Sequence, residues 1–292
     1  VPSIMSVVMM SLDVVFNFFL IFHTRTVDVL GMHITMPGAG LGVVGAAIGT
    51  ASAEFVAASI TMYILCFRNK ELSLKIDSGR FMPTWDVVKR ALHIGLPMGI
   101  QQTIMTSAYI VTTIIIAPLG TFAIAANSFG IIVESLCYMP GYGVSDAATT
   151  LVGQSMGAGR YELMKRFAWL SVALGMGIMT VMGVVMYVGS PFAMAMMTPS
   201  EEVRQLGVEV LRIEAFAEPM FGAAIISYGV FVGAAKTIAP SVMNLISMWG
   251  VRITLAAMLA PSMGLRGVWL AMCLELTFRG VIFLVKLTLW KR

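Results

Sequence analysis

Residues 122–152 read FAIAANSFGIIVESLCYMPGYGVSDAATTLV, an apolar run whose only charged members are Glu134 and Asp146. An α-helix rises about 1.5 Å per residue, so about 20 apolar residues suffice to cross the ~30 Å hydrocarbon core of a bilayer. This run exceeds that length. We therefore expect it to form a membrane-spanning helix.

The same pattern recurs on both sides of this run. Seven more stretches are long and apolar enough to cross a membrane, and short loops separate them. Together they predict eight transmembrane helices, at roughly 1–22, 40–67, 92–117, 122–152, 167–189, 207–235, 238–260 and 267–290. The predicted fold class is an all-α polytopic membrane protein.

The composition agrees with this interpretation. The mean hydropathy is +0.89, and 58% of the residues are hydrophobic while 12% are charged, which leaves too little polar surface for a soluble domain of 292 residues. The three cysteines lie in apolar runs without disulfide or CxxC spacing. The pI of 9.1 comes from basic loops, so we expect no nucleic-acid partner.

The basic residues predict an orientation, because Lys and Arg resist translocation across the membrane. Three of them, Arg25, Arg204 and Arg266, fall in loops on one side. Thirteen fall on the other side: Arg68, Lys70, Lys75, Arg80, Lys89, Arg90, Arg160, Lys165, Arg166, Lys236, Lys286, Lys291 and Arg292. This imbalance places the rich side, and both chain ends, in the cytoplasm.

A short internal repeat relates two parts of the chain. The segments PGAGLGVVGAA at 37–47 and PSMGLRGVWLA at 261–271 share five identical residues at a fixed offset of 224. Transporters are often built from such repeats, and each segment here opens the second helix of a pair. If the pairs correspond, the parent has twelve helices in two lobes, with roughly 130 residues missing upstream.

The repeat therefore predicts three regions. Residues 1–67 are the last two helices of an N-terminal lobe, residues 68–91 are a cytoplasmic linker between lobes, and residues 92–292 are a complete six-helix C-terminal lobe.

Several motifs resemble those of the multidrug and toxic compound extrusion (MATE) transporters. The segment ATTLVGQSMGAG at 148–159 is similar to the family signature that ends a helix before a basic cytoplasmic loop. IGLPMG at 94–99, MWGVR at 248–252 and PGAGLGVVGAAIGT at 37–50 also fit. GAAKTIAP at 233–240 fits as well, with Lys236 where the family usually has Asp. The chain resembles family helices five to twelve.

A candidate cation site lies in the first predicted helix. Asp13 and Asn17 stand four residues apart and share a helix face, and two hard oxygen ligands suit a sodium ion or a shared proton. The resemblance implies such a site from an Asn and an Asp at this spacing, here exchanged, with Thr50 of GAAIGT on the next helix. The predicted cation-binding residues are Asp13, Asn17 and Thr50, and no other metal site is expected. The alternative is a polar pair that hydrogen-bonds between helices.

Polar residues of the predicted second lobe suggest a substrate path. A charge in hydrocarbon costs at least about 2.5–3.5 kcal/mol, so it usually faces a cavity or a partner. The predicted path residues are Gln101, Gln102, Asn127, Glu134, Tyr138 and Glu218. For the acids, the alternative is a structural bond between helices. Two ion pairs are also predicted, Glu275 with Arg279 and Glu209 with Arg212.

Taken with the resemblance, these features predict a secondary antiporter of the inner membrane. It would export small organic, often cationic compounds in exchange for sodium ions or protons, as a monomer without a cofactor. An enzyme is not expected, because the sequence shows no nucleophile–base set and no paired-histidine site.

The alternative is a flippase for lipid-linked oligosaccharide or peptidoglycan precursors of the same superfamily. Acids in the apolar runs outnumber bases eight to three, which favours cationic cargo.

Overall fold

The computed structural model describes residues 2–29, 32–68 and 84–290. Its internal contacts divide the chain into two compact units, unit 1 (Val1–Pro83) and unit 2 (Thr84–Arg292). The predicted linker, residues 68–91, lies mostly outside the described residues. From Trp85 onward, however, it is already helical, since the first helix of unit 2 begins there.

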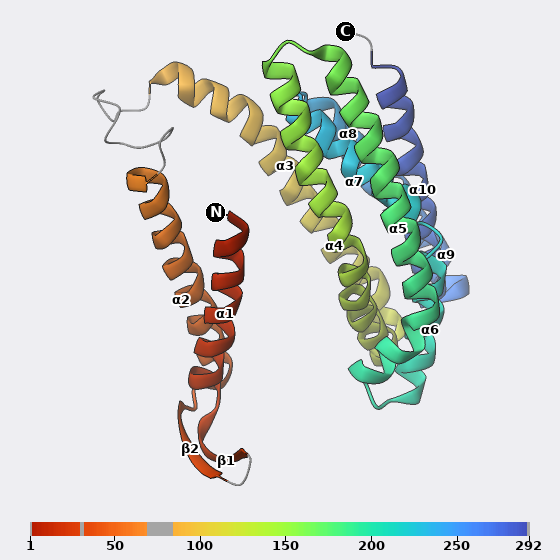
Figure 1. The fold of residues 1–292 in the computed structure, drawn as a ribbon. Coiled ribbons are helices and arrows are strands. Elements are labelled where there is room, and N and C mark those ends of the chain that lie inside the picture. Colours follow the sequence, from red (N-terminus) through yellow and green to blue (C-terminus); the bar gives the residue numbers. More distant parts are fainter. Residues whose placement is uncertain (1, 30–31, 69–83, 291–292) are drawn as a thin grey trace. The chain divides into compact units, whose positions relative to one another are not determined.

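Unit 1 is a pair of helices that carries a two-stranded ribbon at one end (Figure 1). Helix α1 (Pro2–Ile21) packs along α2 (Gly42–Tyr63), which continues into a π-helical turn, Ile64–Arg68. The buried residues of α2 are small and recur once per turn: Gly45, Gly49, Ala53 and Ala57. A Cβ atom on Gly45 would lie 2.4 Å from the Leu20 carbonyl oxygen, so the absence of a side chain allows the two backbones to approach closely.

The connection between these two helices was expected to be a loop, and that expectation is wrong. Strands β1 (His23–Val29) and β2 (Met32–Ala39) form an antiparallel hairpin in which Val29 pairs with Met32. The segment HTRTVDV contains four β-branched residues, two Thr and two Val, which favour a strand. A search for long apolar runs passes over such a short and mostly polar segment.

Unit 2 is a bundle of long helices. Its elements are α3 (Trp85–Ile116), a 3₁₀ turn (Ala117–Leu119), α4 (Thr121–Gly157), α5 (Tyr161–Met197), α6 (Glu201–Glu214), α7 (Glu218–Gly233), α8 (Ile238–Leu245), a π-helical segment (Ile246–Ile253), α9 (Thr254–Met263) and α10 (Leu265–Thr288). Across the described part of the whole chain, seven helical stretches are each long and apolar enough to span a membrane. The bent pair α6 and α7 supplies an eighth, so the prediction of eight spans is confirmed.

Two predicted boundaries in unit 2 are wrong. The helix expected at 167–189 runs from Tyr161 to Met197, so Lys165 and Arg166 lie in its first turns rather than in a loop. The helix expected at 207–235 is two helices that meet at 60°. The turn between them is closed by a hydrogen bond from the Ala217 N–H to the Glu214 carbonyl (2.8 Å), and Pro219, which lacks an N–H, stands in the first turn of α7.

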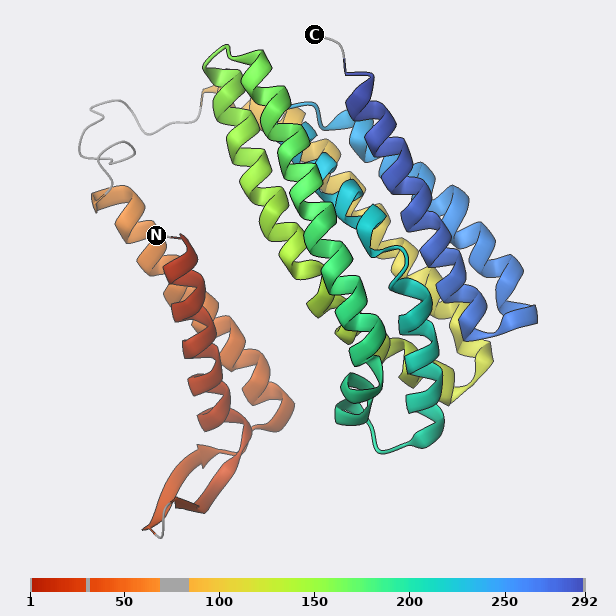
Figure 2. The same cartoon turned by 45° about the vertical axis from the view of Figure 1, so that its right-hand side comes forward.

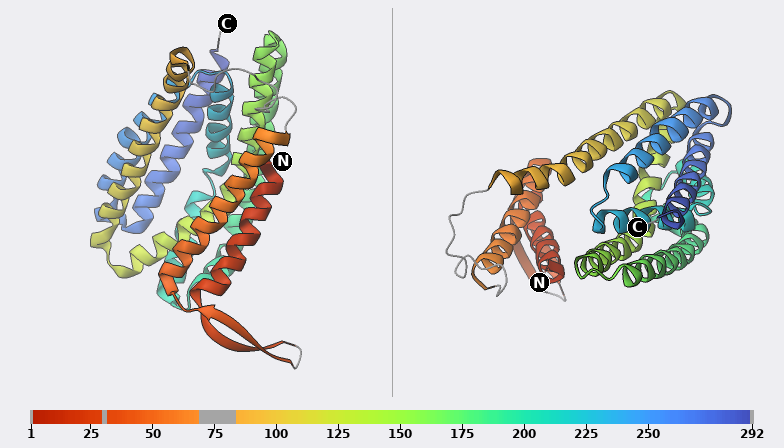
Figure 3. Two further views of the ribbon diagram at one scale, coloured as in Figure 1. Left: turned by 90° about the vertical axis from the view of Figure 1, so that its left-hand side faces the viewer. Right: turned by 90° about the horizontal axis from the view of Figure 1, so that it is seen from above.

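Helix α7 forms the buried centre of unit 2. It packs against α4, α5 and α10, and Figure 3 (right) shows the bundle from above. Most of its residues are buried, from Glu218 to Phe231. Glycines permit the closest approaches: a Cβ on Gly280 of α10 would lie 2.4 Å from the Met220 carbonyl oxygen, and one on Gly233 would lie 2.4 Å from that of Thr149.

Basic residues gather at one end of unit 2. The turn between α4 and α5, the turn between α7 and α8, and the end of α10 lie at the same end in Figure 2. The Lys236 Nζ lies 5.2 Å from the centre of the Trp290 ring, and Lys165 lines a shallow pocket with Thr288. The cluster of positive charge therefore comes from three segments that are distant in the sequence.

The approach of α10 to α7 yields a stability prediction. Gly280→Ala places a methyl group against backbone atoms of Met220, which cannot move aside as a side chain can. We expect a loss of about 1–3 kcal/mol, the usual result of overpacking. The measurement is thermal unfolding in detergent, followed by circular dichroism.

The matched control is Gly177→Ala in α5, where an added Cβ meets nothing within 4 Å. This variant should unfold at or slightly above the wild-type temperature, because Ala favours helix over Gly. Equal melting temperatures for the two variants would contradict the packing argument.

Candidate functional site

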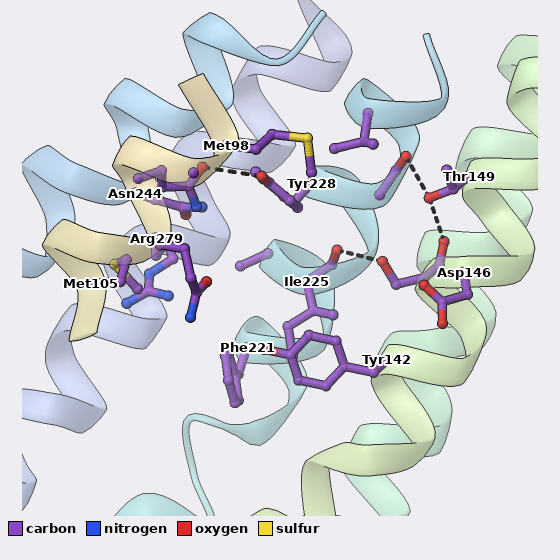
Figure 4. A pocket seen from close by; sticks show the side chains of 17 residues that line it. Met98, Met105, Tyr142, Asp146, Thr149, Phe221, Ile225, Tyr228, Asn244 and Arg279 are labelled. Atoms are coloured by element: carbon purple, nitrogen blue, oxygen red, sulfur yellow. Dashed lines mark hydrogen bonds between the residues drawn. The ribbon is translucent and has the colours of Figure 1, made fainter. Parts of the chain in front are cut away.

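Two adjoining cavities lie among the helices of unit 2. Cavity 1 has a volume of about 580 Å³ and is lined by α3, α4, α7, α8 and α10 (Figure 4). Cavity 2 has a volume of about 390 Å³ and is lined by α3, α4, α7, the π-helical segment and α10. Tyr142, Phe221 and Arg279 line both. Each volume falls within the range of about 300–1,000 Å³ that is usual for small-molecule sites.

Cavity 1 contains both predicted glutamines. Gln101 and Gln102 line it, and Gln101 is buried where its side-chain carbonyl accepts a hydrogen bond from the Tyr228 hydroxyl (3.1 Å). Asp146 and Asn244 add polar groups to the wall, and Met98 and Met105 add flexible apolar ones (Figure 4). The cavity is thus mainly apolar with a few separated polar groups, a composition that suits an organic ligand.

Two hydroxyl groups of α4 form hydrogen bonds to carbonyl groups of α7 and hold these two helices together beside cavity 1. The Ser145 hydroxyl donates to the Ile225 carbonyl (3.0 Å), and the Thr149 hydroxyl donates to the Gly229 carbonyl (2.9 Å), as Figure 4 shows. A Cβ on Gly229 would lie 2.3 Å from the Ser145 Oγ, so the two helices touch along this line. Sequence reasoning did not find these residues, since no local pattern shows which hydroxyl meets a neighbouring helix.

Cavity 2 contains three other predicted path residues. Asn127, Glu134 and Tyr138 all line it. The Asn127 side-chain oxygen accepts a hydrogen bond from the Trp269 indole N–H (3.1 Å), which orients both side chains. The Tyr138 ring meets the Phe221 ring edge to face, with 5.6 Å between ring centres. Glu134 therefore lines cavity 2 beside the rings of Tyr138, Phe221 and Trp269, which contacts with one another or with Asn127 hold in place.

Glu218 is placed differently from the other predicted path residues. It does not line either cavity, and only 1% of it is exposed. Within the described part of the chain, neither of its carboxylate oxygens has a hydrogen-bond partner. Glu214, equally buried at the end of α6, also has one oxygen without a partner there. The bend between α6 and α7 thus brings two buried acids to the centre of the bundle.

The predicted ion pair of Glu275 and Arg279 is confirmed. The Arg279 Nε donates to the Glu275 Oε1 at 2.7 Å, and the Ser247 hydroxyl donates to the same oxygen at 2.5 Å. Arg279 nevertheless lines both cavities, which the sequence did not reveal. The spacing of four residues predicts the ion pair, but it does not predict that the Arg279 side chain also lines the cavities.

The predicted ion pair of Glu209 and Arg212 is wrong. Glu209 is held by Arg266 from α10, through two hydrogen bonds of 2.7 and 2.9 Å. Arg212 instead lies over the Tyr187 ring, 5.2 Å from its centre. A bidentate arginine from another helix outcompetes a neighbour three residues along the same helix.

The candidate cation residues lie in unit 1. Asp13 and Asn17 share a face of α1, and the Asn17 amide N–H₂ donates to the Asp13 Oδ1 at 3.1 Å. The Asn17 Oδ1 is buried and has no partner among the described residues, and a Cβ on Gly49 of α2 would lie 2.4 Å from it. A cation held by both side chains would require the amide to turn its oxygen toward the carboxylate.

Thr50 lies next to Gly49 on α2, but its side chain is exposed. Within the described residues of unit 1, no hydrogen bond joins Thr50 to Asp13 or Asn17. The structure thus brings Asp13 and Asn17 together and places Thr50 one residue beyond their contact with α2. In the part of the chain that the structure describes, no group of three or more His, Cys, Asp or Glu could hold a metal ion.

Comparison with known proteins gives consistent results. The MatE family model matches residues 97–258. A probable multidrug resistance protein NorM of Xylella fastidiosa is 30% identical over 243 residues, which cover 82% of this chain and 52% of that protein. The Thermotoga maritima protein of the same name is 27% identical, over 84% of this chain and 53% of its own length. The chain spans about half the length of the curated relatives it matches.

The fold also matches that of a solved structure. The chain superposes on a mutant of the Vibrio cholerae MATE transporter VcmN with a TM-score of 0.84 and 17% sequence identity. The superposition covers 98% of this chain and 61% of the other. At this identity, the likeness concerns the fold.

The buried acids of unit 2 differ in their partners, which predicts different costs of substitution. Glu275→Gln leaves the buried Arg279 without its carboxylate, and we expect a loss of about 3–5 kcal/mol. Glu218→Gln removes no hydrogen bond, so it should unfold at or above the wild-type temperature. Thermal unfolding in detergent compares the two. An equal loss of stability in Glu218→Gln would show that its carboxylate has a partner.

Proposed function

This chain belongs to the MATE family of transporters, and from that membership we propose that it carries out secondary active efflux of organic drugs or toxic compounds. The export is driven by antiport with sodium ions or protons. The pair of cavities among the helices of unit 2 is the observation that carries this proposal, because a transporter needs a site for its cargo inside the membrane.

The lining of the cavities supports organic cargo. Methionines, tyrosines and Phe221 supply adaptable apolar surface, and few polar groups interrupt it. In this proposal Gln101 and Gln102 contact cargo in cavity 1, and Asn127, Glu134 and Tyr138 contact it in cavity 2. Glu218 lies behind these walls, so its proposed part in the path depends on a rearrangement of the helices around it.

We assign the two units to two lobes. Unit 1 contains the last two helices of an N-terminal lobe, and unit 2 is a six-helix C-terminal lobe. The lobes rock about a central cleft and open it to each side of the inner membrane in turn. Both chain ends lie in the cytoplasm, as the count of basic residues predicts. The protein works as a monomer on small, mostly cationic substrates.

The coupling ion is assigned to Asp13, Asn17 and Thr50. The buried Asn17 oxygen without a partner and the adjacent Asp13 carboxylate offer hard oxygen ligands for sodium or a proton. Binding can drive transport only if the ion has a different affinity for the two conformations. In this proposal the hydrogen bond between Asn17 and Asp13 belongs to one conformation and is broken in the other, where both oxygens turn to the ion, so that the two conformations differ in affinity.

One observation favours a second candidate, a flippase for lipid-linked oligosaccharide or peptidoglycan precursors. Two arginines, Arg252 and Arg279, line cavity 2, and such flippases bind an anionic pyrophosphate. Glu275 already neutralises Arg279, and Glu134 faces the same cavity. Organic efflux therefore remains the better-supported function.

The function is tested by ethidium efflux from vesicles that contain the protein, with a sodium gradient and a proton gradient applied separately. We expect efflux under one of the two gradients, which also identifies the coupling ion. Correctly folded protein that exports ethidium under neither gradient would favour the flippase.

The assignment of the ion site predicts a specific defect. Asp13→Asn removes the only carboxylate of the site and should abolish gradient-driven efflux while leaving ethidium binding unchanged. The matched control is Glu54→Gln on α2, an exposed acid of the same unit, which should transport as wild type does. Efflux by Asp13→Asn that keeps its dependence on the ion would remove Asp13 from the mechanism.

A double variant sharpens this test. D13N/N17D restores the same two ligand types in the opposite order along α1, with the two positions one turn apart. It should recover part of the ion dependence that D13N alone loses.

A further inference from the structure

A small pocket lies between α5 and α10 at the basic end of unit 2 (Figure 2). Its volume is about 90 Å³, so it suits a small polar group rather than a drug-sized compound, which needs about 300 Å³ or more. The residues that line this end pocket are Lys165, Ala168 and Trp169 of α5, with Leu287, Thr288 and Trp290 at the end of α10. It shares no lining residue with cavity 1 or cavity 2.

Two lysines from distant parts of the sequence lie near Trp290. Lys165 lines the end pocket with it, and Lys236, in the turn between α7 and α8, places its Nζ 5.2 Å from the centre of the Trp290 ring. The Trp290 ring packs against the Phe231 ring of α7, with 5.1 Å between ring centres. Neither lysine makes a salt bridge with any residue that the structure describes. Two positive charges without a bound anion therefore gather around an aromatic ring that α7 holds in place.

The balance of charge around the end pocket is positive. Arg160 and Arg166 line two further shallow pockets at the start of α5, and Lys286 is exposed in the last turn of α10. Glu162 is the one acid among the described residues that line the end pocket and these two neighbours. Lys165, Arg160 and Arg166 outnumber it, so this end of unit 2 attracts anions.

The two tryptophans of the end pocket offer hydrogen bonds as well. Two other tryptophans of unit 2, Trp249 and Trp269, each donate the indole N–H to an acceptor on another helix. Within the described part of the chain, Trp169 and Trp290 have no such acceptor. An indole N–H is a donor only, and phosphate oxygens are strong acceptors. The end pocket thus combines positive charge with free donors.

Exposed apolar side chains continue from the end pocket along both helices. Leu170 follows Trp169 on α5, and Val285 and Leu289 are exposed at the end of α10. Both helices are long and apolar enough to span a membrane. Tryptophan is enriched where such spans meet the headgroup region of the bilayer. The end pocket therefore stands at the boundary between hydrocarbon and headgroups.

We propose that the end pocket and Lys236 bind the phosphate group of an anionic phospholipid in the leaflet at this end of unit 2. The phosphate accepts hydrogen bonds from Lys165, Lys236 and the indole N–H groups, while the acyl chains lie against the exposed apolar side chains of α5 and α10. The related transporters usually have Asp where this chain has Lys236, and an acid there would repel the phosphate. The proposal goes beyond efflux and does not depend on it.

Two phospholipids with the same acyl chains test the proposal. Dioleoylphosphatidylglycerol carries a net negative charge, whereas dioleoylphosphatidylcholine carries the same phosphate balanced by a cation. Native mass spectrometry of the purified protein in detergent counts the bound lipids and gives the affinity for each. We expect the tightest phosphatidylglycerol to bind about tenfold or more tightly than phosphatidylcholine, because each nearby lysine contributes a factor of about five.

Variants then assign the preference to the two lysines. Lys165→Gln and Lys236→Gln should each weaken phosphatidylglycerol binding about fivefold and leave phosphatidylcholine binding within about twofold. Lys236→Asp, which introduces the residue usual in the related transporters, should weaken it further. Lys286→Gln is the matched control, because it removes the same charge at the same end but does not line the end pocket. It should change neither affinity by more than about twofold.

Three outcomes would overturn the proposal. They are equal binding of the two lipids to wild-type protein, equal losses in Lys286→Gln and Lys165→Gln, and displacement of phosphatidylglycerol by an equal concentration of glycerol phosphate. The second outcome would indicate a general attraction to the basic surface, and the third a site for free phosphate. Folding of each variant is checked by gel filtration, and the wild-type comparison needs no variant. Since binding is measured without cargo or gradient, absence of ethidium efflux would refute the proposed function and leave the lipid site standing.

Discussion

Unit 2 depends on the close approach of α7 to the helices around it. Along α7 and its neighbours, glycines stand where a side chain would meet backbone: Gly229 and Gly233 against α4, and Gly280 of α10 against Met220. A membrane offers no hydrophobic force between helices, so packing and interhelical hydrogen bonds must hold them together. The hydroxyls of Ser145 and Thr149 add such bonds to α7 carbonyls. The contact between α4 and α7 therefore holds one wall of cavity 1 in place and helps to set the width of the cavity.

The charged groups inside unit 2 divide into those with partners and those without. Glu275 and Arg279 neutralise each other and are further held by Ser247 from the π-helical segment. Glu214, Glu218 and Arg252 make no salt bridge among the described residues, and each keeps at least one buried polar atom there without a hydrogen-bond partner, as Glu275 does at its second oxygen. Charged groups without a partner are costly in hydrocarbon. A ligand, an ion or a proton that binds to these side chains would therefore be stabilised by them. Paired charges hold the scaffold, and the unpaired ones are available for function.

Much of the fold could be predicted from the sequence, because long apolar runs have few alternatives to membrane helices. The bend between α6 and α7 was missed, since Ala215, Phe216 and Ala217 are compatible with helix and Pro219 can stand in a first turn. The site was predicted in part. Gln101, Gln102, Asn127, Glu134 and Tyr138 do line cavities, because polar residues in apolar runs usually face one. Arg252 was not singled out, since only tertiary contacts show that it lines cavity 2.

The π-helical segment connects the scaffold charges to the unpaired one. Its Ser247 binds Glu275, the partner of Arg279, while its Arg252 lines cavity 2. In a π-helix the hydrogen bonds run between residues five apart, and such segments often occur at functional sites. Ser247 and Arg252 stand five residues apart in this segment, so the π-helical geometry brings the hydroxyl and the guanidinium toward the same face.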